Sequence, residues 1–114
     1  MADKVVHWEV TGKDGGKLQQ FYSQLFGWTV KAGNPMNYGI VDASEAGVGG
    51  GIGETETGEG HVTFYVAVDD PQAYLDKAES LGGKTVMPVT EIPNMVTFAL
   101  IADPEGHMVG VVKS

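Results

Sequence analysis

A histidine and a glutamate one residue apart, His7 and Glu9, are the pair in this sequence with the clearest chemical potential. Side chains two positions apart on a strand point to the same face, so the imidazole and the carboxylate would lie together. Such a pair could move a proton as acid and base. The alternative is a structural histidine that is hydrogen-bonded to a neighbour such as Glu9, and the residue types leave both open.

The other two histidines, His61 and His107, differ in whether they could bind a metal ion. His61 has the same parity as Thr63, which lies on a predicted strand. If His61 lies on that strand, it could complete a metal site of two histidines and one carboxylate with the first pair. It borders a glycine-rich connection, which argues against metal binding. His107 follows a predicted turn, and we expect it at the surface.

Composition limits the partners and the location of the protein. The 114 residues include 15 Asp and Glu against 7 Lys and Arg, a net charge of −8. A surface this acidic repels phosphate backbones, which disfavours nucleic acid as a partner. Because there is no cysteine, a metal site would need His, Asp or Glu. With no leader-like start and no run of about 18 apolar residues, we expect a cytoplasmic protein without a membrane partner.

Hydrophobic periodicity indicates the elements that position these side chains. Apolar and polar residues alternate over 5–10, which predicts a strand, and residues 11–16 are assigned to a turn. Apolar residues recur three and four apart over 18–26, which predicts an amphipathic helix. Gly27 suits its left-handed cap, since glycine has no Cβ. Three short strands are predicted next, at residues 28–31, 38–41 and 48–52.

The same order of elements returns in the second half of the chain. Asp70 is the predicted N-cap of a helix, with Pro71 at the first helical position. The predicted strands around this helix are residues 63–68, 84–89, 96–102 and 108–113. The chain is therefore predicted to be one α+β domain of two βαβββ modules. Module 1 covers about residues 1–53, the linker covers 54–60 and module 2 covers 61–114.

This order of elements resembles the vicinal-oxygen-chelate superfamily, which includes glyoxalases, bleomycin-resistance proteins and dioxygenases. The segments that carry the resemblance are residues 6–10, 21–28, 49–52, 66–70 and 103–107. The resemblance covers nearly the whole chain. It implies a curved eight-stranded mixed sheet around a cavity, with the helices outside, and it implies a homodimer.

Metal-dependent members of this superfamily hold their ion with four side chains. The resemblance places these at His7, within residues 49–51, at Thr63 and at Gly110. Glycine has no donor atom in its side chain, so of these positions only His7 can supply a family ligand. We therefore expect no metal cofactor. Glyoxalase I activity is also not expected, because that chemistry needs a metal ion to polarise the substrate.

The resulting prediction is a metal-free protein that binds a small organic molecule, similar to bleomycin-resistance proteins. Its acidic charge would attract a cationic ligand. One alternative is a divergent lyase, isomerase or dioxygenase that uses His7 and Glu9, or a non-standard metal site that includes His61. Another is an interaction module without a small ligand. The predicted ligand-binding cavity, in which the glycines leave space, is lined by His7, Glu9, Gly49, Gly51, Thr63, Tyr65, Met108 and Gly110.

Overall fold

The chain folds into two compact units, seen in a computed structural model that describes residues 2–55 and 57–114. The first unit comprises His7–Thr63. The second unit comprises Phe64–Ser114 together with the N-terminal residues up to Val6. Each unit has its own long helix, and each is described separately below.

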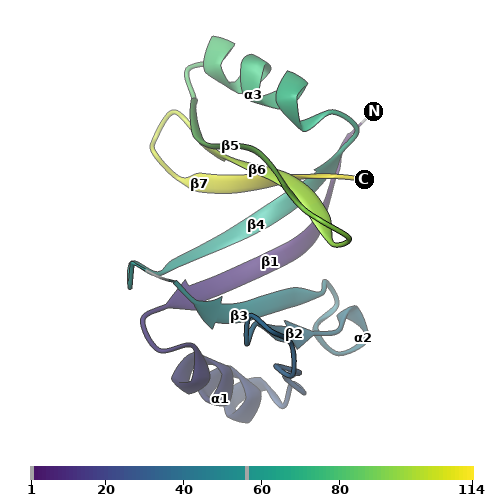
Figure 1. The fold of residues 1–114 in the computed structure, drawn as a ribbon, viewed down its shortest axis with the longest axis vertical. Coiled ribbons are helices and arrows are strands. Elements are labelled where there is room, and N and C mark those ends of the chain that lie inside the picture. The colour runs from purple at the N-terminus through teal and green to yellow at the C-terminus, as the bar shows by residue number, and fades with distance from the viewer. Residues whose placement is uncertain (1, 56) are drawn as a thin grey trace. The chain divides into compact units, whose positions relative to one another are not determined.

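The described residues form a mixed seven-stranded sheet and three helices, which confirms the α+β class (Figure 1). No helix in this part of the chain is long and apolar enough to cross a membrane. In chain order the elements are β1 (Lys4–Gly12), α1 (Gly15–Phe26), β2 (Gly39–Val41), α2 (Ala43–Ala46), β3 (Gly50–Glu54), β4 (His61–Val68), α3 (Pro71–Ser80), β5 (Lys84–Ile92), β6 (Val96–Ala102) and β7 (Met108–Lys113).

One of the eight predicted strands, at residues 28–31, does not form among the described residues. It is reduced to an isolated bridge between Lys31 and Ile40. Side chains take the backbone groups that a strand would use. The carbonyl of Trp28 accepts a hydrogen bond from the Ser23 hydroxyl at 2.8 Å, and the amide of Thr29 donates to the Glu45 carboxylate at 3.1 Å. The sequence pattern also gave no sign of α2, which carries Glu45.

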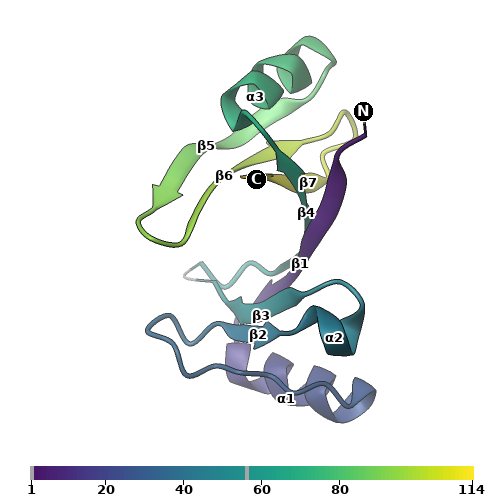
Figure 2. The same ribbon diagram turned by 90° about the vertical axis from the view of Figure 1, so that its right-hand side faces the viewer.

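In the first unit the strand order is β2-β3-β1, with β1 parallel and β2 antiparallel to β3. Helix α1 packs on β3 (Figure 2). The helix starts at Gly15, so the predicted turn at residues 11–16 is wrong. Asp14 is its N-cap and accepts a hydrogen bond from the amide of Lys17. As predicted, Gly27 caps the C-terminal end of α1, and it has a left-handed φ of 73°.

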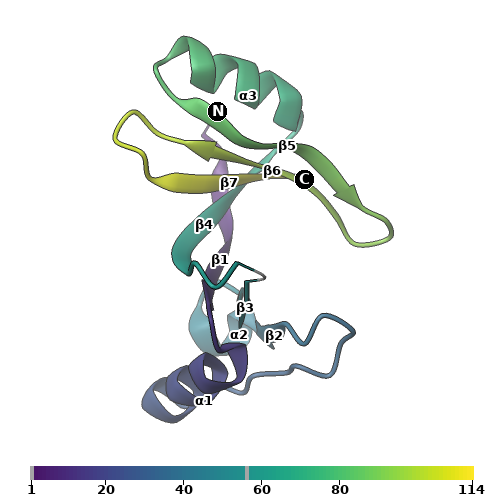
Figure 3. The same ribbon diagram turned by 60° about the vertical axis from the view of Figure 1, so that its left-hand side comes forward.

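In the second unit the strand order is β4-β7-β6-β5, with β4 and β7 parallel and the other pairs antiparallel. Helix α3 begins as predicted, with Asp70 as its N-cap and Pro71 in its first turn. It lies against β5, β6 and β7 (Figure 3). The buried core of this unit consists of Val68, Leu75, Ala99 and Val111. The predicted bounds of β6 and β7 are confirmed.

Candidate functional site

The polar face of β1 carries the residues with chemical potential, all within the first unit. His7, Glu9 and Thr11 alternate along the strand with apolar Trp8 and Val10. All three polar residues are half-buried. The alternation of polar and apolar residues in the sequence therefore correctly predicts that the imidazole and the carboxylate lie on one face of the strand.

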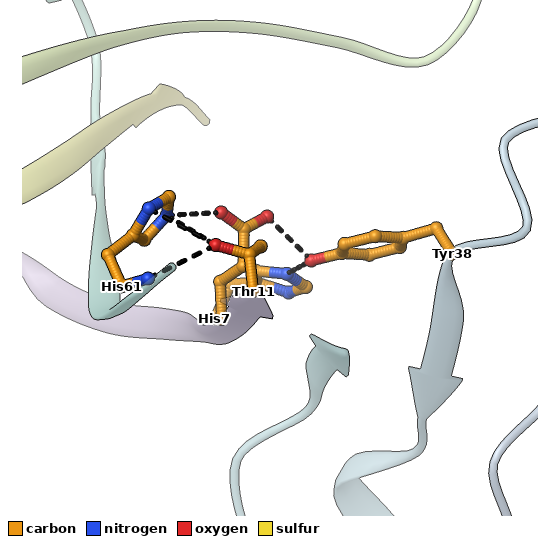
Figure 4. Close-up of polar contacts among 5 residues, drawn as sticks. His7, Thr11, Tyr38 and His61 are labelled. Carbon is orange, nitrogen blue, oxygen red and sulfur yellow. Dashed lines mark hydrogen bonds and ion pairs between the residues drawn. The ribbon is translucent and has the colours of Figure 1, made fainter. Parts of the chain in front are cut away.

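Two residues from outside β1, Tyr38 in the loop before β2 and His61 at the start of β4, join this face to form a hydrogen-bonded group (Figure 4). The Tyr38 hydroxyl lies 2.8 Å from Glu9 Oε2 and 2.9 Å from His7 Nε2. His61 Nε2 lies 3.1 Å from Glu9 Oε1. We call this set the polar cluster; it consists of His7, Glu9, Thr11, Tyr38 and His61.

The hydrogen bonds fix which atoms of the polar cluster carry protons. An ionised carboxylate only accepts, so the Tyr38 hydroxyl gives its single proton to Glu9. His7 must then donate from Nε2–H to the Tyr38 oxygen. Burial lowers the pKa of His7 below its ordinary value of 6.5, against the opposing effect of the Glu9 charge. His7 therefore favours the neutral form with the proton on Nε2.

His61 closes the other side of the Glu9 carboxylate. It is the first residue of β4, so it does lie on that strand. Its Nδ1 lies 3.2 Å from the Thr11 hydroxyl. A hydroxyl can donate to a neutral ring nitrogen or accept from a protonated one. Thr11 can thus accompany His61 in either charge state, while Glu9 provides the ion-pair partner when His61 is protonated.

Two glycines of β3 each lie under an aromatic ring, and Gly51 is the one beneath the polar cluster. Gly50 and Gly51 are neighbours on β3, so they point to opposite faces of the strand. A Cβ at Gly51 would lie inside the Tyr38 ring, and a Cβ at Gly50 would lie inside the Trp8 ring. The open space expected over Gly51 is therefore filled by a side chain of the protein itself. Both glycines are needed for the close approach of a ring.

The second unit repeats this arrangement with different residues. Gly110 on β7 pairs with Tyr65 on β4, and a Cβ at Gly110 would lie inside the Tyr65 ring. The space expected over Gly110 is thus also filled. The Tyr65 ring packs edge-on against Phe98, with 6.3 Å between the ring centroids. Met108, the first residue of β7, is half-buried.

The last two predicted cavity residues, Thr63 and Gly49, lie in the first unit. Thr63 is buried on β4, with 4% of its surface exposed. Gly49 precedes β3, and its carbonyl accepts a hydrogen bond from the amide of Trp8 at 3.3 Å. Tyr38 lies against three of the other predicted cavity residues of the first unit, which are His7, Glu9 and Gly51.

The residues present do not fit the metal site of the superfamily. Two of its four positions are glycines, and the rings of Tyr38 and Tyr65 cover Gly51 and Gly110 where ligand side chains would project. Within residues 2–55 and 57–114, no group of three or more His, Asp or Glu side chains is arranged to hold a metal ion. In the polar cluster, the Glu9 carboxylate is bonded to Tyr38 and His61.

Comparison with known proteins places the chain in a family. The model of the glyoxalase-like domain matches residues 8–112. The chain belongs to the glyoxalase-like domain family. This glyoxalase-like domain is also a member of the vicinal-oxygen-chelate superfamily, as its sequence suggests.

Related sequences have names that contain the word glyoxylase. The glyoxalase-like domain is 34% identical over 99 residues to "Putative glyoxylase CFP32" of Mycobacterium tuberculosis and Mycobacterium bovis, a match that covers 82% of this chain and 37% of theirs. The chain thus spans little more than a third of the length of these relatives. It is 30% identical over 111 residues to a glyoxylase-like domain-containing protein of Didymella fabae, covering 87% and 84% of the two chains.

Solved structures share the fold of the glyoxalase-like domain at low sequence identity. A hypothetical protein from Bacillus halodurans has a TM-score of 0.72 at 10% identity, covering 100% of this chain and 96% of that one. Methylmalonyl-CoA epimerase from Mycobacterium tuberculosis has a TM-score of 0.68 at 12% identity, with 96% and 86% covered. A glyoxalase/bleomycin resistance protein/dioxygenase superfamily member from Vibrio splendidus has 0.66 at 17%, with 99% and 100% covered.

The predicted cavity residues did not include two members of the polar cluster of this glyoxalase-like domain, Tyr38 and Thr11. Thr11 continues the alternation of His7 and Glu9, so a longer predicted strand would have included it. Tyr38 is an aromatic residue that could be assigned to the core. The signal was the glycine run in β3, because a strand interior without side chains often marks a place where a ring packs on the backbone.

Proposed function

We propose that this glyoxalase-like domain binds a small organic molecule at the polar cluster, through hydrogen bonds and without a metal ion. The observation that supports this is the chain of contacts from His7 through Tyr38 to Glu9 and His61. Its donors and acceptors are half-buried, so a ligand can exchange hydrogen bonds with them while losing contact with water. The net charge of −8 favours a ligand with a positive charge elsewhere in its structure.

Calorimetric titration with bleomycin and other basic drugs tests this proposal. Replacing the Glu9 carboxylate by an amide in Glu9→Gln keeps the shape but removes the charge, so we expect the Kd of a cationic ligand to rise by about tenfold or more. His107→Gln is the matched control, since His107 is exposed and bonded to Asp103 outside the polar cluster. Flat titrations across all such compounds would end the proposal of a basic drug as ligand.

The absence of a metal from the proposed function can be tested separately. Elemental analysis of the purified protein should find no stoichiometric zinc, nickel or iron. A metal titration with His7→Ala as the control should show no difference between the two proteins. A tightly held ion that is lost in His7→Ala would contradict metal-free binding.

An acid–base enzyme is the second candidate, and the protonation state of His7 favours it. A neutral imidazole can remove a proton next to a carbonyl group. The relatives described as glyoxylases and the structural neighbour described as methylmalonyl-CoA epimerase suggest the substrates to test. The assay measures by NMR the exchange of substrate C–H for deuterium in D2O, with hemithioacetals and methylmalonyl-CoA as substrates. Exchange should occur with the wild type and be lost in His7→Gln. No exchange above the buffer rate would reject the enzyme.

A further inference from the structure

The Tyr38 side chain occupies a slot whose walls come from the rest of the first unit. Its floor is the backbone of β3 at Gly51 and Gly53, two residues apart and therefore on one face of the strand. The hydroxyl end of the ring lies over Gly51, and a Cβ at Gly53 would be 2.9 Å from Tyr38 Cδ1. The His7 ring lies nearly parallel to the Tyr38 ring, at 21° and 6.2 Å between centroids.

The backbone that carries Tyr38 is held independently of the ring. The Asn34 side chain donates to the Tyr38 carbonyl at 2.6 Å and accepts from the Tyr38 amide at 2.9 Å. Gln19 donates to the carbonyl of Asn37 at 3.0 Å. None of these bonds involves the phenol. The ring can therefore leave the slot by rotating about its side-chain bonds while the backbone stays in place.

We propose that this slot is the aromatic subsite of the protein and that Tyr38 is its internal occupant. A ligand with a hydroxylated aromatic ring displaces the Tyr38 ring and takes over its two hydrogen bonds, from His7 and to Glu9. This inference rests on the proposed function, because it names the class of ligand and the residue that regulates access to the same polar cluster.

The slot favours a ligand with a hydroxyl group, because the slot presents one hydrogen-bond donor and one acceptor to the same ligand atom. His7 Nε2–H needs an acceptor and the Glu9 carboxylate needs a donor, and a hydroxyl supplies both through one oxygen. A carboxylate at this end of a ligand would meet the negative charge of Glu9. A methyl group would supply neither the acceptor for His7 nor the donor for Glu9, so both of these hydrogen bonds would be lost. The preferred ligand is therefore a phenol or a similar neutral hydroxylated ring.

Occupation by Tyr38 weakens the binding of such a ligand. The measured affinity is the intrinsic affinity multiplied by the fraction of molecules whose slot is open. Tyr38→Phe keeps a ring over Gly51 but lacks the hydroxyl, so the internal occupant is held less firmly. Tyr38→Ala empties the slot. Affinity for a phenol should therefore increase from the wild type to Tyr38→Phe and again to Tyr38→Ala.

The test uses p-cresol, which has the same ring and hydroxyl as a tyrosine side chain, and toluene, which lacks only the hydroxyl. We expect p-cresol to bind Tyr38→Ala at least about tenfold more tightly than toluene does, because the hydroxyl regains two hydrogen bonds. We expect p-cresol to bind Tyr38→Phe about fivefold more tightly than the wild type. Tyr74→Phe is the matched control, since the Tyr74 hydroxyl is bonded to Asp3 in the second unit; its affinity for p-cresol should equal that of the wild type.

Displacement itself can be seen by ¹⁹F NMR on protein labelled with fluorotyrosine, in which Tyr38→Phe and Tyr74→Phe identify two of the signals. Saturating p-cresol should move the Tyr38 signal of the wild type and leave the Tyr74 signal unchanged. Equal binding of toluene and p-cresol to a folded Tyr38→Ala protein would overturn the inference. Unchanged affinity in Tyr38→Phe would also overturn it, and this variant retains the ring that supports the fold.

The outcome is separable from that of the proposed function. If the wild type binds a ligand through Glu9 but the Tyr38 variants gain no affinity for p-cresol, the aromatic subsite is rejected and the proposed binding function remains. If the Tyr38 variants gain the expected affinity but the wild type binds no compound in the titrations, the aromatic subsite is supported and the proposed binding function is rejected.

Discussion

The replacement Gly51→Ala tests the packing of Tyr38 on β3 most directly. A methyl group at this position would overlap the Cζ and hydroxyl of Tyr38, so the ring must leave its place. The loss of its hydrogen bonds to His7 and Glu9 costs about 1 to 3 kcal/mol each, the larger figure applying to the charged partner. Alanine in a strand regains about 0.5 to 1 kcal/mol relative to glycine. We expect the free energy of unfolding to fall by about 3 kcal/mol in total.

A double-mutant cycle separates this overlap from other effects of the methyl group. In a Tyr38→Ala background the obstacle is gone, so Gly51→Ala should be neutral or stabilise the protein by about 0.5 to 1 kcal/mol. Gly33→Ala is the matched control, because a Cβ at Gly33 meets no atom within 4 Å and this glycine has no positive φ. It should be neutral or slightly stabilising in both backgrounds.

Urea unfolding followed by circular dichroism gives the four free energies. If Gly51→Ala is as stable as Gly33→Ala, the Tyr38 ring does not pack on Gly51 as described. If Gly51→Ala costs the same with and without the tyrosine ring, the cost does not come from the contact with Tyr38.

Three further predictions concern pH, the second unit and a helix end. Because burial lowers the pKa of His7 in the folded state, stability should be fully present above pH 6.5 and fall as pH drops through the lower folded value, and thermal melts of His7→Gln should show a weaker loss over the same range. Gly110→Ala should destabilise the protein by displacing the Tyr65 ring, and urea unfolding should show that Tyr65→Ala relieves this cost. Asp70→Ala should lower the unfolding free energy by about 1 kcal/mol, measured in the same way, because the amide of Ala73 loses its cap.

Local patterns in the sequence predicted those parts of the fold that depend on neighbouring residues. The alternation around His7 and Glu9 placed both side chains on one face of β1. Asp70 and Pro71 located the start of α3, since a cap acts within one turn of its helix. These features need no knowledge of distant segments.

Features that depend on distant contacts were not predictable in the same way. The strand expected at residues 28–31 fails because Ser23 and Glu45 take its backbone hydrogen bonds. The glycines of β3 were expected to leave space for a ligand, but an aromatic residue 13 positions before Gly51 fills it. A glycine has the same appearance in a sequence whether a ligand or a side chain of the same protein lies above it. The partner has to be found in three dimensions.

The rings on either side of β3 also restrict how this domain can change during evolution. A side chain with a donor atom at position 51 would overlap Tyr38, and one at position 50 would overlap Trp8. Acquiring a metal ligand at position 51 therefore requires two substitutions, and either one alone passes through a less stable protein. Selection acting on single mutations would rarely follow that route, so the tyrosine that now fills the slot also acts as a barrier against metal-dependent chemistry at this strand.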